Sequence, residues 1–273
     1  MYRLLLLIVL LALWTGCGGS NDSSAGGGGD AMADSDGCGE EEEDASAGAG
    51  GGTYSPAKGT ATVRGTVRFE GNPPKRRPLD LGAEEFCVAE HTDKPLRSET
   101  TIVGKDGGLA NVFVHVKSGL KGWKFAKATG DVVLDQFGCQ YVPHMLGAQV
   151  GQTLKVRNSD PIMHNVHAMN MKSGKDLFNR AQTKKGAELT LTLKRAAFYR
   201  VKCDVHGWMG SHVMVVKHPF YAVTGEDGAF TLAKLPPGTY TLEGWHEKLG
   251  TQTTSVTVGD GETKEIKLSF KKS

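Results

Sequence analysis

The sequence lacks any apolar run long enough to cross a bilayer as a helix, and it lacks a sustained helical period. The longest unbroken apolar run, Leu4 to Trp14, is far shorter than the roughly 20 residues that a membrane-spanning helix needs. The run follows a basic residue, Arg3, and ends in small residues, a pattern typical of a secretory signal. Export, rather than a helical membrane span, is therefore expected.

Two kinds of functional pattern are also missing. No basic stretch is interleaved with aromatic residues, which make up only 7% of the chain, so we expect no nucleic acid partner. No Ser/His/Asp or paired-carboxylate arrangement stands out for hydrolysis. The sequence therefore gives no indication of an enzyme.

Large apolar residues are nearly absent between Gly18 and Gly52, where Gly, Ser, Ala and acidic residues dominate. Such a segment cannot bury enough surface to order itself, so residues 18–59 are predicted to be a flexible acidic tether. Nine of the 30 acidic residues but only two of the 32 basic residues precede Thr60. The rest of the chain therefore has a net charge of +9, whereas the whole chain has a net charge of +2. This excess either steers an acidic protein partner or forms an ordinary solvated surface.

Cysteine is scarce, with five residues in the chain, and one of them directly follows the apolar run. The segment Leu13-Trp14-Thr15-Gly16-Cys17 resembles a bacterial lipobox, with Trp14 where lipoboxes usually carry Leu. The resemblance implies a signal peptide over residues 1–17, acylation of Cys17, and anchoring to a bacterial membrane on the periplasmic side or at the cell surface. Plain secretion is the alternative, and either route leads to a compartment that permits disulfides.

Short segments of alternating polarity, rich in Val, Thr, Tyr and Phe and separated by turn residues, follow the tether. This pattern predicts an all-β fold. Residues 173–181 are the exception, where a short turn or helix is expected. The predicted strands are Thr62 to Phe69, Ala110 to Val116, Thr153 to Asn158, Glu188 to Leu193, Phe198 to Cys203, His212 to Lys217, Ala229 to Leu232, Thr239 to Trp245, Thr251 to Val258 and Glu265 to Phe270.

Two hairpin-like turns flank alternating strands near the C-terminus, in Val223 to Leu232 and Leu235 to Leu242. This part resembles a carboxypeptidase regulatory-like β-sandwich, a transthyretin-type module of the immunoglobulin-like kind. That family usually begins with a Gly-x-Val strand, which Gly65-Thr66-Val67 fits. The resemblance implies one sandwich split between residues 60–128 and 218–273, with a second domain at 129–217 inserted; two separate modules are the alternative. The sheet to which Ala110 to Val116 belongs is left open.

Three metal donors follow one another at three-residue steps between two alternating strands. They are Cys203, His206 and Met209. A thiolate, an imidazole and a weak thioether make up most of the donor set of a blue copper site, which needs one more imidazole. His164 is the candidate, because it restarts a strand after the polar turn that begins at Asn158.

The string His164-Asn165-Val166, followed by Tyr-x-x-x-Cys-x-x-His-x-x-Met from Tyr199 to Met209, resembles the cupredoxin family. The resemblance implies a Greek-key β-sandwich and one type 1 copper ion. Its trigonal ligands would be His164, Cys203 and His206, with Met209 as the long axial ligand. Asn165 would hydrogen-bond across to the cysteine loop, and the imidazole of His206 would present a partly exposed edge as a docking face.

The function expected from these resemblances is that of a one-electron carrier outside the cytoplasm, with a cytochrome or a dehydrogenase-type redox protein as partner and the membrane reached through the lipid anchor. A copper-binding protein for storage, delivery or sensing is one alternative. A surface adhesion module with a vestigial copper site is another.

The remaining cysteines and histidines give weaker patterns. Cys87 and Cys139 are predicted to form a disulfide, or to join His91 and His144 in a second metal site. Five further residues have three open interpretations, namely ordinary packing, a low-affinity cuprous site or a copper-uptake patch. These residues are His144, Met145, His167, Met169 and Met171. His212 is expected to bind no metal, and no role is assigned to three further histidines: His115, His218 and His246.

Overall fold

The computed structural model describes residues 51–272, and this part of the chain is all-β, as predicted. Two short helical elements interrupt the strands: one helix, α1 (Glu85–Glu90), and one 3-10 turn, η1 (Pro56–Lys58). The strands are β1 (Gly52–Thr53), β2 (Ala61–Glu70), β3 (Phe113–Ser118), β4 (Trp123–Lys124), β5 (Asp131–Gln136), β6 (Tyr141–Val142), β7 (Met145–Gln149), β8 (Thr153–Asn158), β9 (His164–Asn170), β10 (Asp176–Gln182), β11 (Glu188–Thr192), β12 (Ala197–Lys202), β13 (Gly210–Val216), β14 (Tyr221–Val223), β15 (Ala229–Leu235), β16 (Gly238–His246), β17 (Gly250–Val258) and β18 (Thr263–Lys271).

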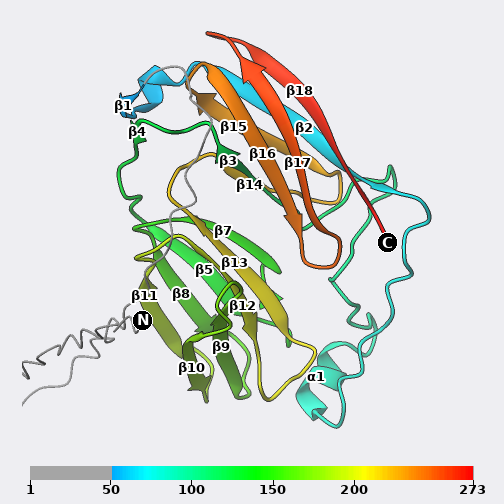
Figure 1. The fold of residues 1–273 in the computed structure, drawn as a ribbon. Coiled ribbons are helices and arrows are strands. Elements are labelled where there is room, and N and C mark those ends of the chain that lie inside the picture. Colours follow the sequence, from blue (N-terminus) through cyan, green and yellow to red (C-terminus); the bar gives the residue numbers. More distant parts are fainter. Residues whose placement is uncertain (1–50, 273) are drawn as a thin grey trace, which may run out of the picture. The chain divides into compact units, whose positions relative to one another are not determined.

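The middle of the chain forms two sheets, drawn mostly in green and yellow in Figure 1. One has the strand order β10-β9-β12-β13-β7 and the other β11-β8-β5-β6. Alternate residues of their strands point inward, as the period of two in the sequence requires. The shared core includes Val156, Val166, Val201 and Val213, all nearly inaccessible to solvent. This core holds the strands that carry the candidate ligands.

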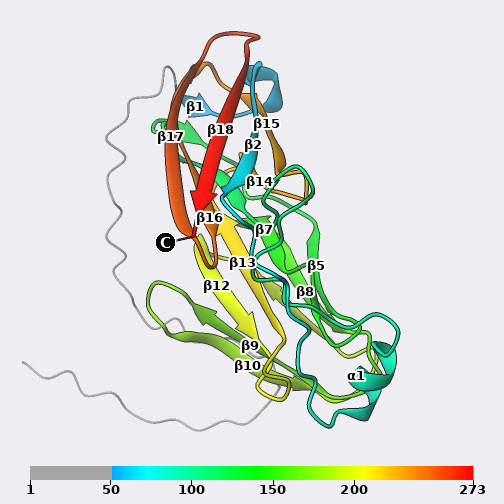
Figure 2. The same cartoon turned by 90° about the vertical axis from the view of Figure 1, so that its right-hand side faces the viewer.

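The two ends of the described chain form a second pair of sheets, with the orders β14-β3-β16-β17 and β15-β2-β18. Figures 1 and 2 both show the early strand β2 beside the last strand β18, and the two pair in parallel from Thr62 with Thr263 to Glu70 with Lys271. Phe230, Leu242 and Phe270 lie in the core between these sheets. A strand from the front of the chain thus completes a sandwich built mainly from its C-terminal part.

The structure answers the question left open about Ala110 to Val116. Strand β3 covers most of this segment and pairs with β14 and β16, so it belongs to the second pair of sheets. The boundaries predicted at 128/129 and 217/218 fall between β4 and β5 and between β13 and β14.

Two local predictions are wrong in part. Residues 173–181 were expected to hold a turn or short helix; a turn is present at Ser173, but the segment from Asp176 onward forms most of β10, which pairs antiparallel with β9 and shields its edge. The predicted tether, residues 18–59, ends earlier than expected, because β1 pairs with β4 and Tyr54 packs its ring against Phe125 and Phe220. Tertiary contacts order a segment whose composition alone could not.

The predicted signal peptide, the predicted lipid-anchor residue Cys17 and the first 33 residues of the predicted tether, 18–50, lie outside the described residues. Within residues 51–272, no helix is long and apolar enough to span a membrane.

Candidate metal centre

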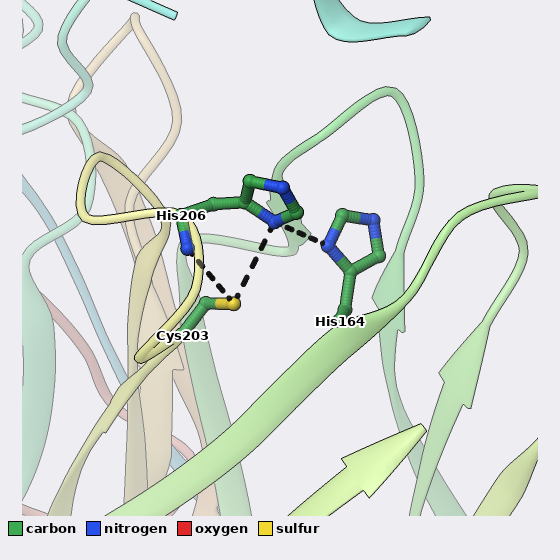
Figure 3. A group of neighbouring side chains, drawn as sticks. All are labelled: His164, Cys203 and His206. Carbon is green, nitrogen blue, oxygen red and sulfur yellow. Dashed lines mark hydrogen bonds between the residues drawn. The ribbon is translucent and has the colours of Figure 1, made fainter. Parts of the chain in front are cut away.

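Three of the four predicted ligands converge in the first pair of sheets. His164 is the first residue of β9, whereas Cys203 and His206 lie in the loop between β12 and β13. β9 and β12 are antiparallel neighbours, so the start of one strand lies beside the end of the other. Figure 3 shows both imidazole rings and the Cys203 sulfur facing a common point.

The distances between the donor atoms suit a single metal ion. Nδ1 of His164 lies 2.9 Å from Nδ1 of His206, and Sγ of Cys203 lies 3.7 Å from the same His206 atom. Metal bonds of about 2.0 Å to nitrogen and about 2.3 Å to thiolate place two donors of one ion about 3 to 4 Å apart. All three side chains are buried. The donor set therefore fits a metal ion that prefers nitrogen and thiolate ligands, such as copper.

The surroundings of Cys203 favour a thiolate. Its sulfur accepts backbone hydrogen bonds from Asn165 at 3.4 Å and from His206 at 3.3 Å. Burial by itself raises the pKa of the Cys203 thiol, but the neighbouring imidazole of His164 and these backbone hydrogen bonds outweigh it and lower the pKa. The loop therefore stabilises the ligand form of the cysteine.

Sequence reasoning missed the residue that positions His164. The buried carboxylate of Asp160 accepts a hydrogen bond from Nε2 of His164 at 2.8 Å. Backbone N–H groups of Gly138 and Cys139, each 2.8 Å away, hold that carboxylate in turn. With the proton on Nε2, the lone pair of His164 is on Nδ1, the atom that faces the other donors. The only signal in the sequence was an acidic residue four positions before His164, in the polar turn.

Asn165 makes the contact with the cysteine loop that the family resemblance implied. Its Oδ1 accepts a hydrogen bond from the backbone N–H of Asp204 at 3.2 Å. The hydroxyl of Tyr141 donates to the backbone carbonyls of Asn165 and Lys202. These bonds tie the strand that bears one imidazole to the strand that leads to the thiolate.

The expectation of an exposed His206 edge is wrong. His206 is only 3% exposed, and Oε2 of Glu84 lies 3.6 Å from its Nε2, which has no hydrogen-bond partner. Glu84 directly precedes α1, in a segment that sequence periodicity did not identify. The segment packs Leu81 and Leu96 in a cluster that includes Trp208 of the ligand loop. The face of the imidazole that was predicted to be open is therefore covered.

Met209 is buried and belongs to the same apolar cluster as Cys203. Its backbone closes the loop, because its N–H donates to the carbonyl of His206 at 2.9 Å and its carbonyl accepts from the N–H of Cys203 at 3.3 Å. The tight loop thus sets the Met209 backbone directly against the two ligands.

Cys87 and Cys139 form a disulfide in the structure. The alternative, a metal site made of these cysteines with His91 and His144, does not form, because both sulfurs are engaged in the disulfide. Nε2 of His91 instead donates to the carbonyl of Gly138 at 2.8 Å. His144 pairs with Glu247 in another part of the fold.

The further histidines and methionines do not come together as one cuprous site. His144 and Met145 lie at the start of β7, whereas His167 and Met169 lie on β9, and β12 and β13 separate these two strands in the sheet. Neighbouring strands are about 4.8 Å apart, so β7 and β9 are about 14 Å apart. His167 instead forms ion pairs with Asp176 and Asp204.

Comparison with known proteins gives two kinds of match. A family model of the carboxypeptidase regulatory-like domain matches residues 208–271. No curated protein matches the chain. Among solved structures, a reduced amicyanin variant is 28% identical over 32% of this chain and 83% of that chain, with a TM-score of 0.29. A reduced Cu(I) form of another amicyanin variant at pH 4 is 29% identical over 33% of this chain and 85% of that chain, also with a TM-score of 0.29.

A TM-score of 0.29 is too low for the likeness to amicyanin to support a functional conclusion. The family match starts inside the ligand loop and leaves out β2, the front strand that completes the sandwich. It nevertheless covers β14 to β18, the strands for which the sequence predicted that family. The chain therefore contains a carboxypeptidase regulatory-like domain in its C-terminal part.

Proposed function

We propose that this chain is a type 1 copper protein that carries single electrons outside the cytoplasm. One observation carries the proposal: two imidazole Nδ1 atoms and one thiolate sulfur, from His164, His206 and Cys203, face one another in a buried pocket at distances that suit one ion. Two imidazoles and a thiolate in trigonal arrangement, with a weak axial thioether, are the donor set of blue copper sites.

Copper bound to such donors supplies reversible one-electron chemistry. Contacts within this chain would hold the donors in one arrangement in both oxidation states. Asp160 fixes the ring of His164, and backbone N–H groups fix the Cys203 sulfur. A site that does not rearrange suits a carrier, because little reorganisation accompanies the transfer.

We further propose an extracytoplasmic location with a lipid anchor at Cys17. The Cys87–Cys139 disulfide supports export, because disulfides persist in oxidising compartments. The +9 charge beyond residue 59 supports an acidic redox protein, of the cytochrome or dehydrogenase type, as the partner. The alternative of copper storage or delivery has less support, because the additional His and Met residues lie on separated strands.

Loading the purified chain with one equivalent of Cu(II) tests the proposal. We expect an intense blue thiolate-to-copper absorption band and reversible one-electron voltammetry. Cys203→Ser should abolish the band while near-ultraviolet circular dichroism stays unchanged, and the double variant Cys87→Ser/Cys139→Ser should remain blue as the matched cysteine control.

Three results would overturn the proposal. Retention of the blue band by Cys203→Ser would disprove the ligand assignment. A colourless chain that binds several Cu(I) ions would point to delivery, and a chain that binds no copper would point to an adhesion module.

A further inference from the structure

A second group of buried donor side chains lies apart from the Cys203 centre. His144, His212 and Glu247 offer ligand atoms that all lie within 4.8 Å of one another. His144 directly precedes β7, His212 lies on β13, and Glu247 lies in the turn between β16 and β17. The group therefore joins the five-stranded sheet to a hairpin of the carboxypeptidase regulatory-like domain.

The two imidazoles of this group are unusual because each has a nitrogen without a hydrogen-bond partner. His144 and His212 are 9% and 7% exposed, and Nδ1 of each ring makes no hydrogen bond. A buried polar atom without a partner destabilises a fold.

Two carboxylates flank the ring of His144. Nε2 of His144 hydrogen-bonds to Oε1 of Glu247, and Oε2 of Glu99 lies 3.7 Å from Nδ1 on the opposite side of the ring. A histidine that binds a metal through one nitrogen and faces a carboxylate with the other is a common arrangement in metal sites. Glu99 is placed to orient His144 in this way.

We propose that His144, His212 and Glu247 bind a zinc ion, with Glu99 as a positioning residue. The ion would take the place of the proton that His144 and Glu247 share. In a tetrahedral site with bonds of about 2.0 to 2.2 Å, two zinc ligands lie about 3.3 to 3.6 Å apart. Donors that lie within 4.8 Å must therefore close by up to about 1.5 Å, whereas His144 and Glu247, which are already hydrogen-bonded, must separate to admit the ion.

The donor types narrow the choice to metal ions that accept imidazole and carboxylate ligands, zinc among them. Two imidazole nitrogens and one carboxylate oxygen are a ligand set of catalytic zinc sites, which leave a fourth position open. Cu(I) prefers thiolate and thioether sulfur, and Mg²⁺ prefers oxygen ligands throughout, so neither suits this group.

A cavity of about 420 Å³ borders the group and provides room for the fourth ligand. Its lining includes the three proposed zinc ligands and also Cys203 and Met209, but not His164 or His206, so the cavity borders the loop that carries Cys203. Arg200 and Lys248 also line this cavity. Their positive charges oppose the binding of a cation, and the two nearby carboxylates of Glu99 and Glu247 offset them.

Titration of the full chain with zinc sulfate at pH 7, followed by calorimetry and metal analysis, tests the proposal. We expect one zinc per chain once one equivalent of copper fills the Cys203 centre, because the imidazoles and the thiolate of that centre would otherwise also accept zinc. All zinc measurements on the parent chain use this copper-loaded form. His212→Asn and Glu247→Gln should each weaken zinc binding by more than about a hundredfold, because loss of even an outer partner of a metal ligand costs about 10- to 100-fold. Glu99→Gln should weaken zinc binding by about 10- to 100-fold.

Three controls separate this site from its alternatives. Glu262→Gln removes a carboxylate that pairs with Lys264 outside the group, and it should leave zinc binding unchanged. Cys203→Ser should also leave it unchanged, because the proposed ligands include no sulfur. X-ray absorption at the zinc edge should show nitrogen and oxygen neighbours only, and zinc should raise the melting temperature of the parent chain but not that of Glu247→Gln.

The proposal is overturned if the parent chain binds no zinc, or if Glu247→Gln binds zinc as tightly as the parent chain. Loss of zinc binding in Cys203→Ser, or a sulfur neighbour at the zinc edge, would place the ion in the other centre and also overturn it. If His212→Asn does not fold, Glu247→Gln decides the question, because Glu247 lies in a hairpin turn and its isosteric change keeps the side-chain volume.

Discussion

Oδ2 of Asp160 lies 2.8 Å from Nε2 of His164, and the imidazole of His164 has no contact with solvent. Burial alone lowers the pKa of His164, but the hydrogen bond and charge of Asp160 outweigh it, so the pKa is raised. The pair fixes the ring orientation and directs Nδ1 toward Cys203 and His206. A residue outside the donor set therefore sets the geometry of the proposed copper centre.

Replacing Asp160 with Asn should weaken copper binding by about 10- to 100-fold without abolishing the blue band. The amide can still accept a hydrogen bond from His164, but it carries no charge and cannot accept from both Gly138 and Cys139 N–H groups as the carboxylate does. Competition with a copper chelator measures the affinity. Asp135→Asn is the matched control, because Asp135 accepts from Ser159 and does not bond to His164. Equal affinities in the two variants would contradict the positioning role.

Replacing Met209 with Leu should keep the blue band and raise the reduction potential. The two side chains have similar volumes, so the buried position is kept filled. Loss of a weak sulfur donor destabilises the oxidised centre more than the reduced centre, and the axial ligand is a known determinant of potential in such sites. Voltammetry measures the change. An unchanged potential would show that Met209 is not a ligand.

Removing the disulfide with Cys87→Ser/Cys139→Ser should lower the free energy of unfolding by about 4 kcal/mol, because the bond closes a loop over a sequence separation of 52. The bond also holds the segment around α1 against the cluster that contains Trp208. We expect this segment to loosen and His206 to become more accessible. Urea unfolding measures the loss of stability. The rate of electron exchange with a small inorganic oxidant measures the accessibility of His206, and we expect this rate to increase. Unchanged exchange would show that the segment does not limit access to His206.

The stability of the fold should decrease below pH 6.5, in part because of His218. Burial lowers the pKa of His218 to about 3, whereas an unfolded histidine titrates near 6.5. Between these values the unfolded chain binds more protons, so the contribution of His218 is complete above about pH 6.5 and is lost as the pH falls toward 3, at about 1.4 kcal/mol per pH unit.

Replacing His218 with Gln should reduce the slope of stability against pH by about 1.4 kcal/mol per pH unit in this range. His218 donates to the Val116 carbonyl and accepts from the Phe220 N–H, so the variant also loses some stability at every pH. Denaturant unfolding at a series of pH values compares the two slopes. Above pH 7 the two curves should run parallel, and parallel curves below pH 6 would disprove the assignment.

The all-β class and three of the four proposed ligands could be read from the sequence, because both depend on local patterns, whereas the assignment of His164 depends on the family resemblance. Alternation with period two marks a strand wherever it occurs, and a hairpin loop fixes the relative positions of Cys203, His206 and Met209 through their spacing. Residues 173–181 show the limit of such reasoning, since their strand β10 exists because β9 offers a partner, not because the segment alternates cleanly.

Only the tertiary structure decided what surrounds the donors. Glu84 covers His206, Asp160 is held by backbone groups of residues 138 and 139, and His144 meets Glu247 from a hairpin about a hundred residues away. None of these pairs follows a spacing rule, because each joins loops whose relative positions are set by how the sheets pack. The sequence by itself determined which atoms can bind a metal, and the packing of the sheets determined which of them meet.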